Sequence, residues 1–305
     1  FNTNVLNART TRAEVLDWQA DYERTYGQFE DVPQPRLTTV DVRLDLFPED
    51  RRYRLAGSYT LANDTASPIS TVFVAIRREA TVENVSLEGG ELVATDARFG
   101  MYRFELAAPL APGARIRLDF ELEVASRGFV VGAPEPSIVE NGSLLMSFRS
   151  FPTIGYRKTY EIADPRERSR RGLEGASVAE LDGEGAHGDV ESDGPEWVDF
   201  AATVSTSADQ TAIAPGRLDA AWERDGRRFF RYVSDAPMLN RFAFASARYE
   251  VATRRHGNRD IEVYYHAGHQ ANVDRMLDAA ADALDVLEAE FGAYRHRQLR
   301  IAEVP

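Results

Sequence analysis

The sequence of 305 residues contains no cysteine, and Lys158 is its only lysine. Without cysteine, a disulfide framework and a thiolate metal site are both excluded. Positive charge is also in deficit, because the formal net charge is −13. Phosphate binding needs clustered positive charge, so no nucleic acid is expected among the partners.

Long hydrophobic runs are missing as well. The longest ones, such as residues 72–76 and 129–131, fall far short of the roughly 20 apolar residues that span a bilayer. No transmembrane helix is expected between residues 1 and 305, and no charged segment followed by an apolar one marks a signal peptide. With 43% hydrophobic and 28% charged residues, the composition is that of an ordinary folded domain.

Motifs for hydrolysis and phosphate binding are absent too. The sequence has no H-E-x-x-H zinc helix, no G-x-S-x-G elbow and no glycine-rich phosphate loop. His266 and His269 form an H-x-x-H pair, but zinc needs about four ligands and no correctly spaced carboxylate follows. We interpret the pair as surface histidines beside a helix, with zinc binding as the alternative. No catalytic residue and no metal ligand are therefore predicted in this chain.

Several segments carry the period-two pattern of half-buried strands. Apolar and polar residues alternate over residues 40–46, 53–61 and 116–124, and turn-forming clusters of Asn, Asp, Gly and Pro separate the segments. Short strands with one polar face indicate antiparallel sheets packed as a sandwich. The predicted fold class is mainly β, an antiparallel β-sandwich followed by a short strand-helix-strand α/β segment.

Two segments have helical periodicity. The first covers residues 14–26 and precedes an extended, proline-containing connector. The second, residues 270–291, has an acidic outer face that should stay wet and ends before Gly292. Strands are predicted on either side of it, at residues 261–265 and 299–304. Its apolar stripe consists of Val273, Met276, Leu277, Ala280, Leu284, Leu287 and Phe291. All of these except Ala280 and Phe291 are named as the predicted packing residues.

Residues 163–196 break this order. The segment opens with arginines and continues as a Gly, Asp, Glu and Ser stretch with too little apolar surface to offset the entropy of ordering. It is predicted to be an acidic flexible loop, sensitive to proteases. The chain then divides into a helix and linker at 1–35, a β-sandwich domain at 36–256, and the truncated start of an α/β domain at 257–305.

The order of these elements and several strings resemble the aminopeptidase N family of zinc metallopeptidases. The strands at residues 40–47 and 53–63 are similar to the family's opening β-sandwich, and the Pro-Leu-Ala-Pro-Gly string at 109–113 is similar to one of its turns. Residues 264–305 look like the first strand, helix and strand of the thermolysin-like catalytic domain. The resemblance implies the saddle-like N-terminal domain of this family.

A narrower resemblance is to a bacterial branch in which an ABC-transporter-type permease precedes the peptidase-like domain. The strings FNTNVLN at 1–7 and DQTAIAPG at 209–216 carry it. It implies a membrane-tethered domain on the extracytoplasmic side of a bacterial inner membrane, with residues 1–35 next to the membrane. The implied partners are the permease portion, the chain's own missing catalytic domain and peptides.

The resemblance also implies a role. The chain would be the non-catalytic N-terminal part of a zinc aminopeptidase homologue, a wall of the substrate cleft and a scaffold, with zinc in the full-length protein only. The stretch matching the family's amine-binding residue offers Ser147, Phe148 and Arg149 as cleft candidates. The alternative is a β-sandwich binding domain of a transporter-associated protein that has lost peptidase activity. Ending after a strand, the chain is also expected to associate through Leu299, Ile301 and Val304.

Overall fold

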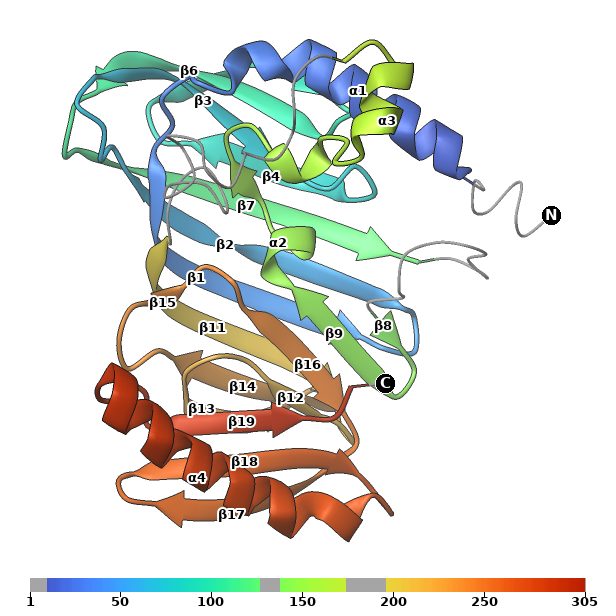
Figure 1. Cartoon of the computed structure of the whole chain (residues 1–305), viewed down its shortest axis with the longest axis vertical. Helices are drawn as coiled ribbons and strands as arrows, with labels where there is room; N and C mark the ends of the chain where they lie inside the picture. Colours follow the sequence, from blue (N-terminus) through green and yellow to red (C-terminus); the bar gives the residue numbers. More distant parts are fainter. Residues whose placement is uncertain (1–9, 127–137, 174–195, 305) are drawn as a thin grey trace.

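The largest element of the structure, a computed structural model that describes residues 10–126, 138–173 and 196–304, is an eight-stranded sheet. Figure 1 shows its strands stacked along the long axis of the molecule. Seven follow the order β13-β14-β11-β1-β2-β7-β4, and β15 pairs with one end of β11. Their bounds are β1 (Arg36–Phe47), β2 (Arg52–Ala62), β4 (Thr81–Leu87), β7 (Arg115–Ala125), β11 (Trp197–Ser207), β13 (Arg217–Arg224), β14 (Arg227–Val233) and β15 (Met238–Leu239).

The alternation in the sequence fixes which face of this sheet is inside. Val40, Val42, Leu44 and Leu46 of β1 are buried in one core, while the residues between them face the other side. The same holds along β2 and β7. The predicted strands and the mainly β fold class are thus confirmed. One pairing departs from the antiparallel expectation, since β1 and β11 run parallel.

Two four-stranded sheets cover the inner face. One has the order β10-β3-β6-β5 and lies toward the β4 end; the other has the order β12-β16-β9-β8 and lies toward the β13 end. Both contribute apolar side chains to the core of the large sheet. Their bounds are β3 (Ile69–Ala75), β5 (Gly90–Asp96), β6 (Met101–Leu110), β8 (Ile138–Val139), β9 (Gly142–Met146), β10 (Thr153–Ile154), β12 (Thr211–Ile213) and β16 (Ala243–Ala247).

Strand β3 is buried on both faces, which explains the first helix. Val72 and Val74 face the large sheet, whereas Phe73 and Ala75 face a separate aromatic cluster. Helix α1 (Arg12–Tyr26) closes that cluster with Tyr22, and the 3₁₀ helix η2 (Gly27–Phe29) follows it. Helix α1 begins with a capping box in which Thr11 and Glu14 exchange hydrogen bonds. The helix predicted at 14–26 is confirmed as a cover over β3.

The last unit is a three-stranded sheet with one long helix. Strands β17 (Tyr249–His256), β18 (Arg259–His266) and β19 (Gln298–Ala302) pair in that order, and β18 and β19 run parallel. The sheet therefore begins before the boundary predicted at residue 257. A 3₁₀ turn, η4 (Gln270–Asn272), leads into helix α4 (Val273–Phe291). Gly292 ends this helix with a φ of 90°, which favours glycine.

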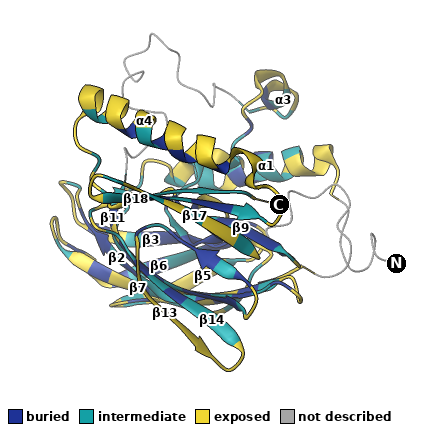
Figure 2. Ribbon diagram, turned by 90° about the horizontal axis from the view of Figure 1, so that it is seen from below, coloured by how far each residue is buried: buried dark blue, intermediate teal, exposed yellow. Residues whose placement is uncertain are grey.

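The packing stripe of α4 is narrower than predicted. Buried residues recur at the spacing i, i+4, i+7 and i+11 and contact Ile261 and Val263 of β18; they are Val273, Leu277, Ala280 and Leu284. Met276 and Leu287 are exposed instead, because a three-stranded sheet covers only one stripe of the helix. Figure 2 shows this exposed outer side of α4. At the chain end, Leu299 and Ile301 are partly buried and pack against the α4 cluster, whereas Val304 is exposed.

The segment from residue 163 is partly ordered, contrary to its prediction as a flexible loop. Helix α3 (Pro165–Arg170) begins at an Asp164 cap, and the nearly buried Arg168 contacts Glu23 of α1 at 2.6 Å. This ion pair joins α3 to α1. Residues 174–195, the rest of the predicted loop, lie outside the described part of the chain. Two short helices, α2 (Ser147–Ser150) and the 3₁₀ helix η3 (Lys158–Tyr160), precede α3. No helix among the described residues is long and apolar enough to cross a membrane.

Candidate functional site

The candidate residues Ser147, Phe148 and Arg149 form the first turn of α2, directly after β9. Ser147 is buried and connects two strands: its backbone N–H donates to the Phe242 carbonyl at 2.8 Å, and its hydroxyl accepts from the Phe242 N–H at 3.1 Å. Phe148 and Arg149 are exposed. The structure thus separates the three candidates into one structural residue and two surface residues.

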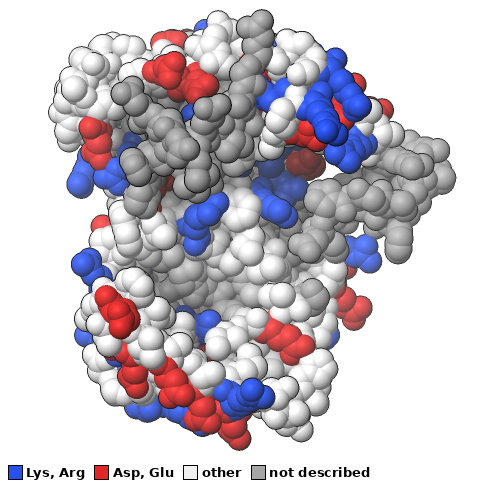
Figure 3. Space-filling view, viewed as in Figure 1, with Lys and Arg blue, Asp and Glu red and all other residues white. Residues whose placement is uncertain are grey.

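Three arginines lie around Phe148, and only Arg241 among them is distant in the sequence. The Arg149 guanidinium lies 5.5 Å and the Arg241 guanidinium 5.8 Å from the centre of its ring. Arg157 donates from Nη2 to the Phe148 carbonyl at 2.6 Å. The sequence analysis did not identify Arg241 and Arg157, because no local pattern distinguishes them from the many other arginines. Figure 3 shows Lys and Arg side chains gathered in the middle of the face where Figure 1 places α2.

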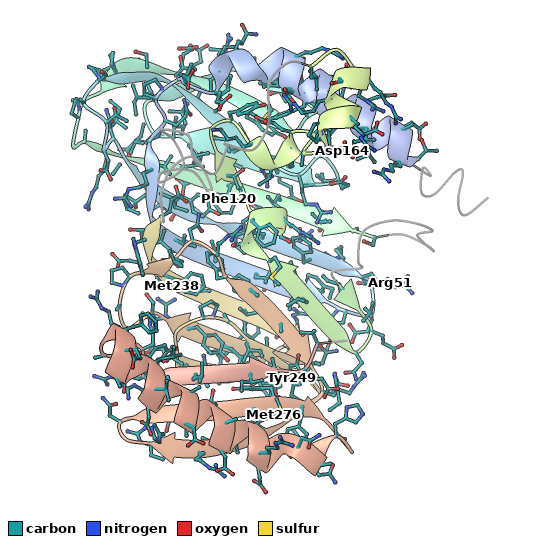
Figure 4. All side chains as sticks on the ribbon, viewed as in Figure 1. Arg51, Phe120, Asp164, Met238, Tyr249 and Met276 are labelled. Atoms are coloured by element: carbon teal, nitrogen blue, oxygen red, sulfur yellow. The ribbon has the colours of Figure 1, made fainter. Side chains whose placement is uncertain are left out.

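An apolar groove of about 450 Å³ lies between β9 and β16 on one side and β19 on the other. Leu144 and Ala243, which approach α2 along β9 and β16, line one wall, and Met238 of β15 lies at the same groove. Strand β19 lines the opposite wall, and the three-stranded sheet ends with it. Figure 4 labels Met238 near the upper end of the last unit. Apolar lining beside an outer strand suits an extended peptide.

Arg300 of β19 holds the two walls of this groove together. Its Nε donates to Glu262 at 2.5 Å, and its Nη1 donates to the carbonyl oxygens of Ala214 and Gly216 at 3.2 and 2.5 Å. The guanidinium also lies 5.1 Å from the centre of the Tyr232 ring. The last unit is therefore fixed to the β-sandwich by a charged, largely buried side chain.

Tyr249, labelled in Figure 4, makes a further contact within the three-stranded sheet. Its hydroxyl donates to the Glu303 carbonyl at 2.7 Å. Burial, followed by the nearby Glu303 carboxylate, raises the pKa of Tyr249 to about 12, so the phenol stays protonated and remains a donor at neutral pH. The end of β19 is thereby held in a fixed position against β17.

The histidine pair is not a metal site in this structure. Glu303, distant in sequence, approaches both histidines, but one oxygen accepts from the His266 backbone N–H at 2.8 Å and the other contacts His269 Nδ1 at 2.6 Å. In the described ranges, no three His, Asp or Glu side chains are grouped to hold a metal ion. A zinc site needs about four ligands. The residues present therefore do not fit the zinc ion that the resemblance implies for the full-length protein.

A second, wider hollow lies on the opposite, outer face of the eight-stranded sheet and measures about 900 Å³. Small side chains such as Ala56, Ser58 and Thr203 make its floor. At one side Trp222 of β13 stacks on Phe229 of β14, with ring centres 5.4 Å apart and planes 7° from parallel. Trp222 keeps 40% of its surface exposed. Aromatic surface of this kind is enriched at binding sites.

No protein-family model matches this sequence, and no curated protein matches it. Solved structures match it in fold. The M1 zinc metallopeptidase of Deinococcus radiodurans is similar with a TM-score of 0.58 and 18% identity over 88% of this chain and 55% of its own. A mutant of that organism's enzyme, bound to a Tyr-Ser-Ala substrate, gives the same TM-score and identity, with 56% of its chain covered. A two-domain M1 zinc metallopeptidase mutant bound to L-tryptophan gives a TM-score of 0.57.

These likenesses show the fold alone. The described chain shares the architecture of part of the M1 zinc metallopeptidases, and it spans a little over half of their length. This agrees with the predicted saddle-like β-sandwich followed by a strand-helix-strand unit.

Proposed function

We propose that this chain is the non-catalytic part of a zinc-aminopeptidase-type protein, one wall of its substrate cleft and the scaffold for its catalytic domain. The observation that carries the proposal is the apolar groove between β9, β16 and β19. The fold likeness to part of the M1 zinc metallopeptidases supports it, one of them having been solved with a tripeptide substrate. Peptides are the proposed ligands.

The groove would hold an extended peptide. Strand β19 lies at the end of its sheet and offers backbone groups along one edge, while Leu144, Ala243 and Ala245 offer an apolar surface opposite. Added strands gain affinity from backbone hydrogen bonds and specificity from side-chain pockets. Arg300 keeps the two walls at a fixed spacing, so little ordering is needed on binding.

The scaffold role is supported by helix α4. Leu287 and Phe291 keep 52% and 83% of their surface exposed, and Val286 lies beside them. Apolar residues grouped at one end of a helix suit an interface with another domain. We propose that the catalytic domain packs there and that its own residues hold the zinc ion, which would polarise the scissile carbonyl and activate water.

The test is peptide binding at the groove. We expect the C-terminally amidated peptide Tyr-Ser-Ala to bind the chain in calorimetry, and Leu144→Trp to weaken this binding by roughly tenfold by filling the groove. The matched control is Leu92→Trp on β5, an exposed leucine distant from the groove. Absence of binding, or equal binding to both variants, would refute the proposal.

A second candidate function is an interaction domain that has lost peptidase chemistry. The hollow on the outer sheet face, with Trp222 stacked on Phe229, favours it. One simple observation would distinguish the two functions. An H-E-x-x-H motif with a downstream glutamate, encoded after residue 305 in the same gene, favours the peptidase; its absence favours the interaction domain.

We also propose that the chain is tethered to a membrane permease and lies on the extracytoplasmic side of a bacterial inner membrane. The support is the sequence resemblance at residues 1–7 and 209–216. Protease treatment of intact spheroplasts should cleave the protein if it faces outward. Protection until the membrane is broken would contradict this location.

A further inference from the structure

The hollow on the outer face of the eight-stranded sheet is not used by the peptide-groove proposal. Its volume of about 900 Å³ is within the range of small-molecule sites in proteins. The short side chains of Ala56, Ser58 and Thr203 keep its floor low, while longer charged and aromatic side chains stand around them. This sheet face therefore has room for a ligand.

One row of side chains on the outer face crosses the hollow. Strand register places five residues side by side on adjacent strands, in the order Trp222, Phe229, Ser205, Asp45 and Arg54. All of them except Ser205 line the hollow. Neighbouring strands lie roughly 4.8 Å apart, so the row is about 19 Å long. An elongated ligand fits this row better than a compact one.

The polar groups of the row are held in place before any ligand binds. Arg227 donates from Nη2 to the Ser205 hydroxyl at 2.7 Å and to the Leu46 carbonyl at 2.8 Å. Ser205 in turn donates to Asp45 Oδ1 at 2.6 Å, and Arg43 donates from Nε to Asp45 Oδ2 at 2.9 Å. A site whose side chains are already ordered loses less entropy on binding.

The charges in the hollow largely cancel one another. Its lining contains six arginines and five aspartate or glutamate residues. They form pairs, such as Arg117 with Asp119 at 2.7 Å, whose side chains stay 60% and 42% exposed. Donors and acceptors therefore lie next to each other with little net charge. This arrangement favours neither an anion nor a cation, whereas a hydroxyl group, which both donates and accepts, finds partners of both kinds.

Trp222 supplies the apolar part of the hollow. Its parallel stack on Phe229 holds the indole in place, while 40% of the Trp222 surface stays exposed. The face of an aromatic ring carries negative charge and attracts polarised C–H groups. A sugar ring presents C–H groups on its face and hydroxyl groups around its edge. Trp222 and the paired ions next to it match these two kinds of group.

We propose that the hollow binds an uncharged oligosaccharide, with one sugar ring stacked on Trp222 and hydroxyl groups of the following units hydrogen-bonded to Arg43 and Asp119. The inference rests on the hollow that the second candidate function invokes and names the ligand class for it. It is independent of the peptide groove, which lies on the other side of the sheet. No covalent bond is made or broken in this step.

The experiment is calorimetry with three neutral hexasaccharides, cellohexaose, maltohexaose and N-acetylchitohexaose. We expect at least one of them to bind and Trp222→Ala to weaken this binding by roughly tenfold. Arg43→Gln should weaken it less, and Trp222→Phe should retain most of the affinity because a phenyl ring still offers a flat face. The matched control is Trp197→Ala, since Trp197 is an exposed tryptophan of the same sheet that lies outside the hollow. Circular dichroism of each variant confirms folding.

The outcomes separate the proposals. If none of the hexasaccharides binds at millimolar concentration, the oligosaccharide site is overturned. The peptide groove, tested with amidated Tyr-Ser-Ala, and the interaction-domain function, tested by the downstream gene sequence, then stand or fall separately. Equal weakening by Trp222→Ala and Trp197→Ala would place the sugar elsewhere and overturn the site.

Two further readings test the ligand class. The affinity for the neutral sugar should not change between low and high salt, because no net charge is neutralised. A steep loss of affinity with salt would show recognition of charge and overturn the assignment. Amidated Tyr-Ser-Ala should bind Trp222→Ala as it binds the wild type. Loss of peptide binding in this variant would assign the hollow to peptides and overturn the inference.

Discussion

Arg300 Nη1 donates a hydrogen bond to the backbone carbonyl oxygen of Gly216 at 2.5 Å, across the junction between the last sheet and the β-sandwich. Gly216 has a φ of 88°, and a Cβ at this position would lie 2.5 Å from the Val233 carbonyl oxygen. The acceptor is thus a carbonyl whose position only glycine permits. Both residues define how the two walls of the groove are spaced.

Replacing Arg300 by methionine should therefore destabilise the protein strongly. The change leaves the largely buried Glu262 carboxylate without its partner, at a cost of about 3 kcal/mol in the free energy of unfolding. Urea denaturation measures it. Arg117→Met, which removes an exposed and solvent-screened pair with Asp119, should lower the free energy of unfolding far less. Equal losses in the two variants would mean that Arg300 does not hold the junction.

Stability should fall in acid, and Glu123 should contribute to the fall. Hydrogen bonds, first from Arg54 and then from Arg52, hold the pKa of Glu123 below its ordinary value of 4.5. A depressed folded pKa gives stability that is present above 4.5 and is lost as the pH falls toward the folded value. Unfolding midpoints from pH 7 to 3 should therefore vary less in Glu123→Gln than in the wild type.

Glu161 provides the opposite case. Burial raises the pKa of Glu161 in the folded protein. Its contribution to folding stability is therefore present at low pH and is lost as the pH rises through that raised pKa. The Glu161→Gln variant should lose this contribution, so its stability should depend more steeply on pH in the acid range than that of the wild type. If the stabilities of Glu123→Gln and Glu161→Gln changed with pH in the same way, the opposite directions assigned to the two pKa shifts would be contradicted.

The chain should associate through α4 at high concentration. The exposed Leu287 and Phe291 give the apolar surface for this contact, rather than Leu299 and Ile301 as the sequence indicated. In sedimentation velocity, the sedimentation coefficient of the wild type should increase with concentration. That of the double variant Leu287→Glu, Phe291→Glu should not. Val304→Glu tests the chain end. If this variant alone became monomeric, association would run through the β19 end instead.

The purified chain should neither hold one zinc ion tightly nor hydrolyse aminoacyl substrates. The reason is the geometry of Glu303, whose two oxygens already serve His266 and His269. Metal analysis after dialysis and an aminoacyl-nitroanilide assay with added zinc provide the two measurements. One zinc per chain, lost in His269→Ala, would overturn this expectation.

Much of the fold could be predicted from periodicity, because a strand with one wet face shows it directly, as in residues 40–46. The parallel pairing of β1 with β11 could not, since Val40 and Phe200 are far apart in the sequence and either direction buries the same side chains. The stripe of α4 was overestimated because periodicity reports the apolar face of a helix and not the width of the sheet beneath it.

The candidate site was predictable only in part. Phe148 and Arg149 were found through the family resemblance, while Arg241 lies more than ninety residues further along the chain and carries no local signal. Their proximity results from the β9–β16 pairing, which is a long-range property. The hydroxyl of Ser147, the third candidate, accepts a hydrogen bond from the backbone N–H of Phe242, a contact that the sequence alone does not indicate.

The stacking of the eight-stranded sheet along the long axis has a mechanical consequence. Helix α1 and helix α4 lie at opposite ends of that axis (Figure 1). Hydrogen bonds between neighbouring strands run across the strands, so a pull between the two ends would load the ladders along their bonds and open them one after another. The molecule would yield stepwise at low force under such tension, while a load applied along the strands would meet all bonds of a ladder together.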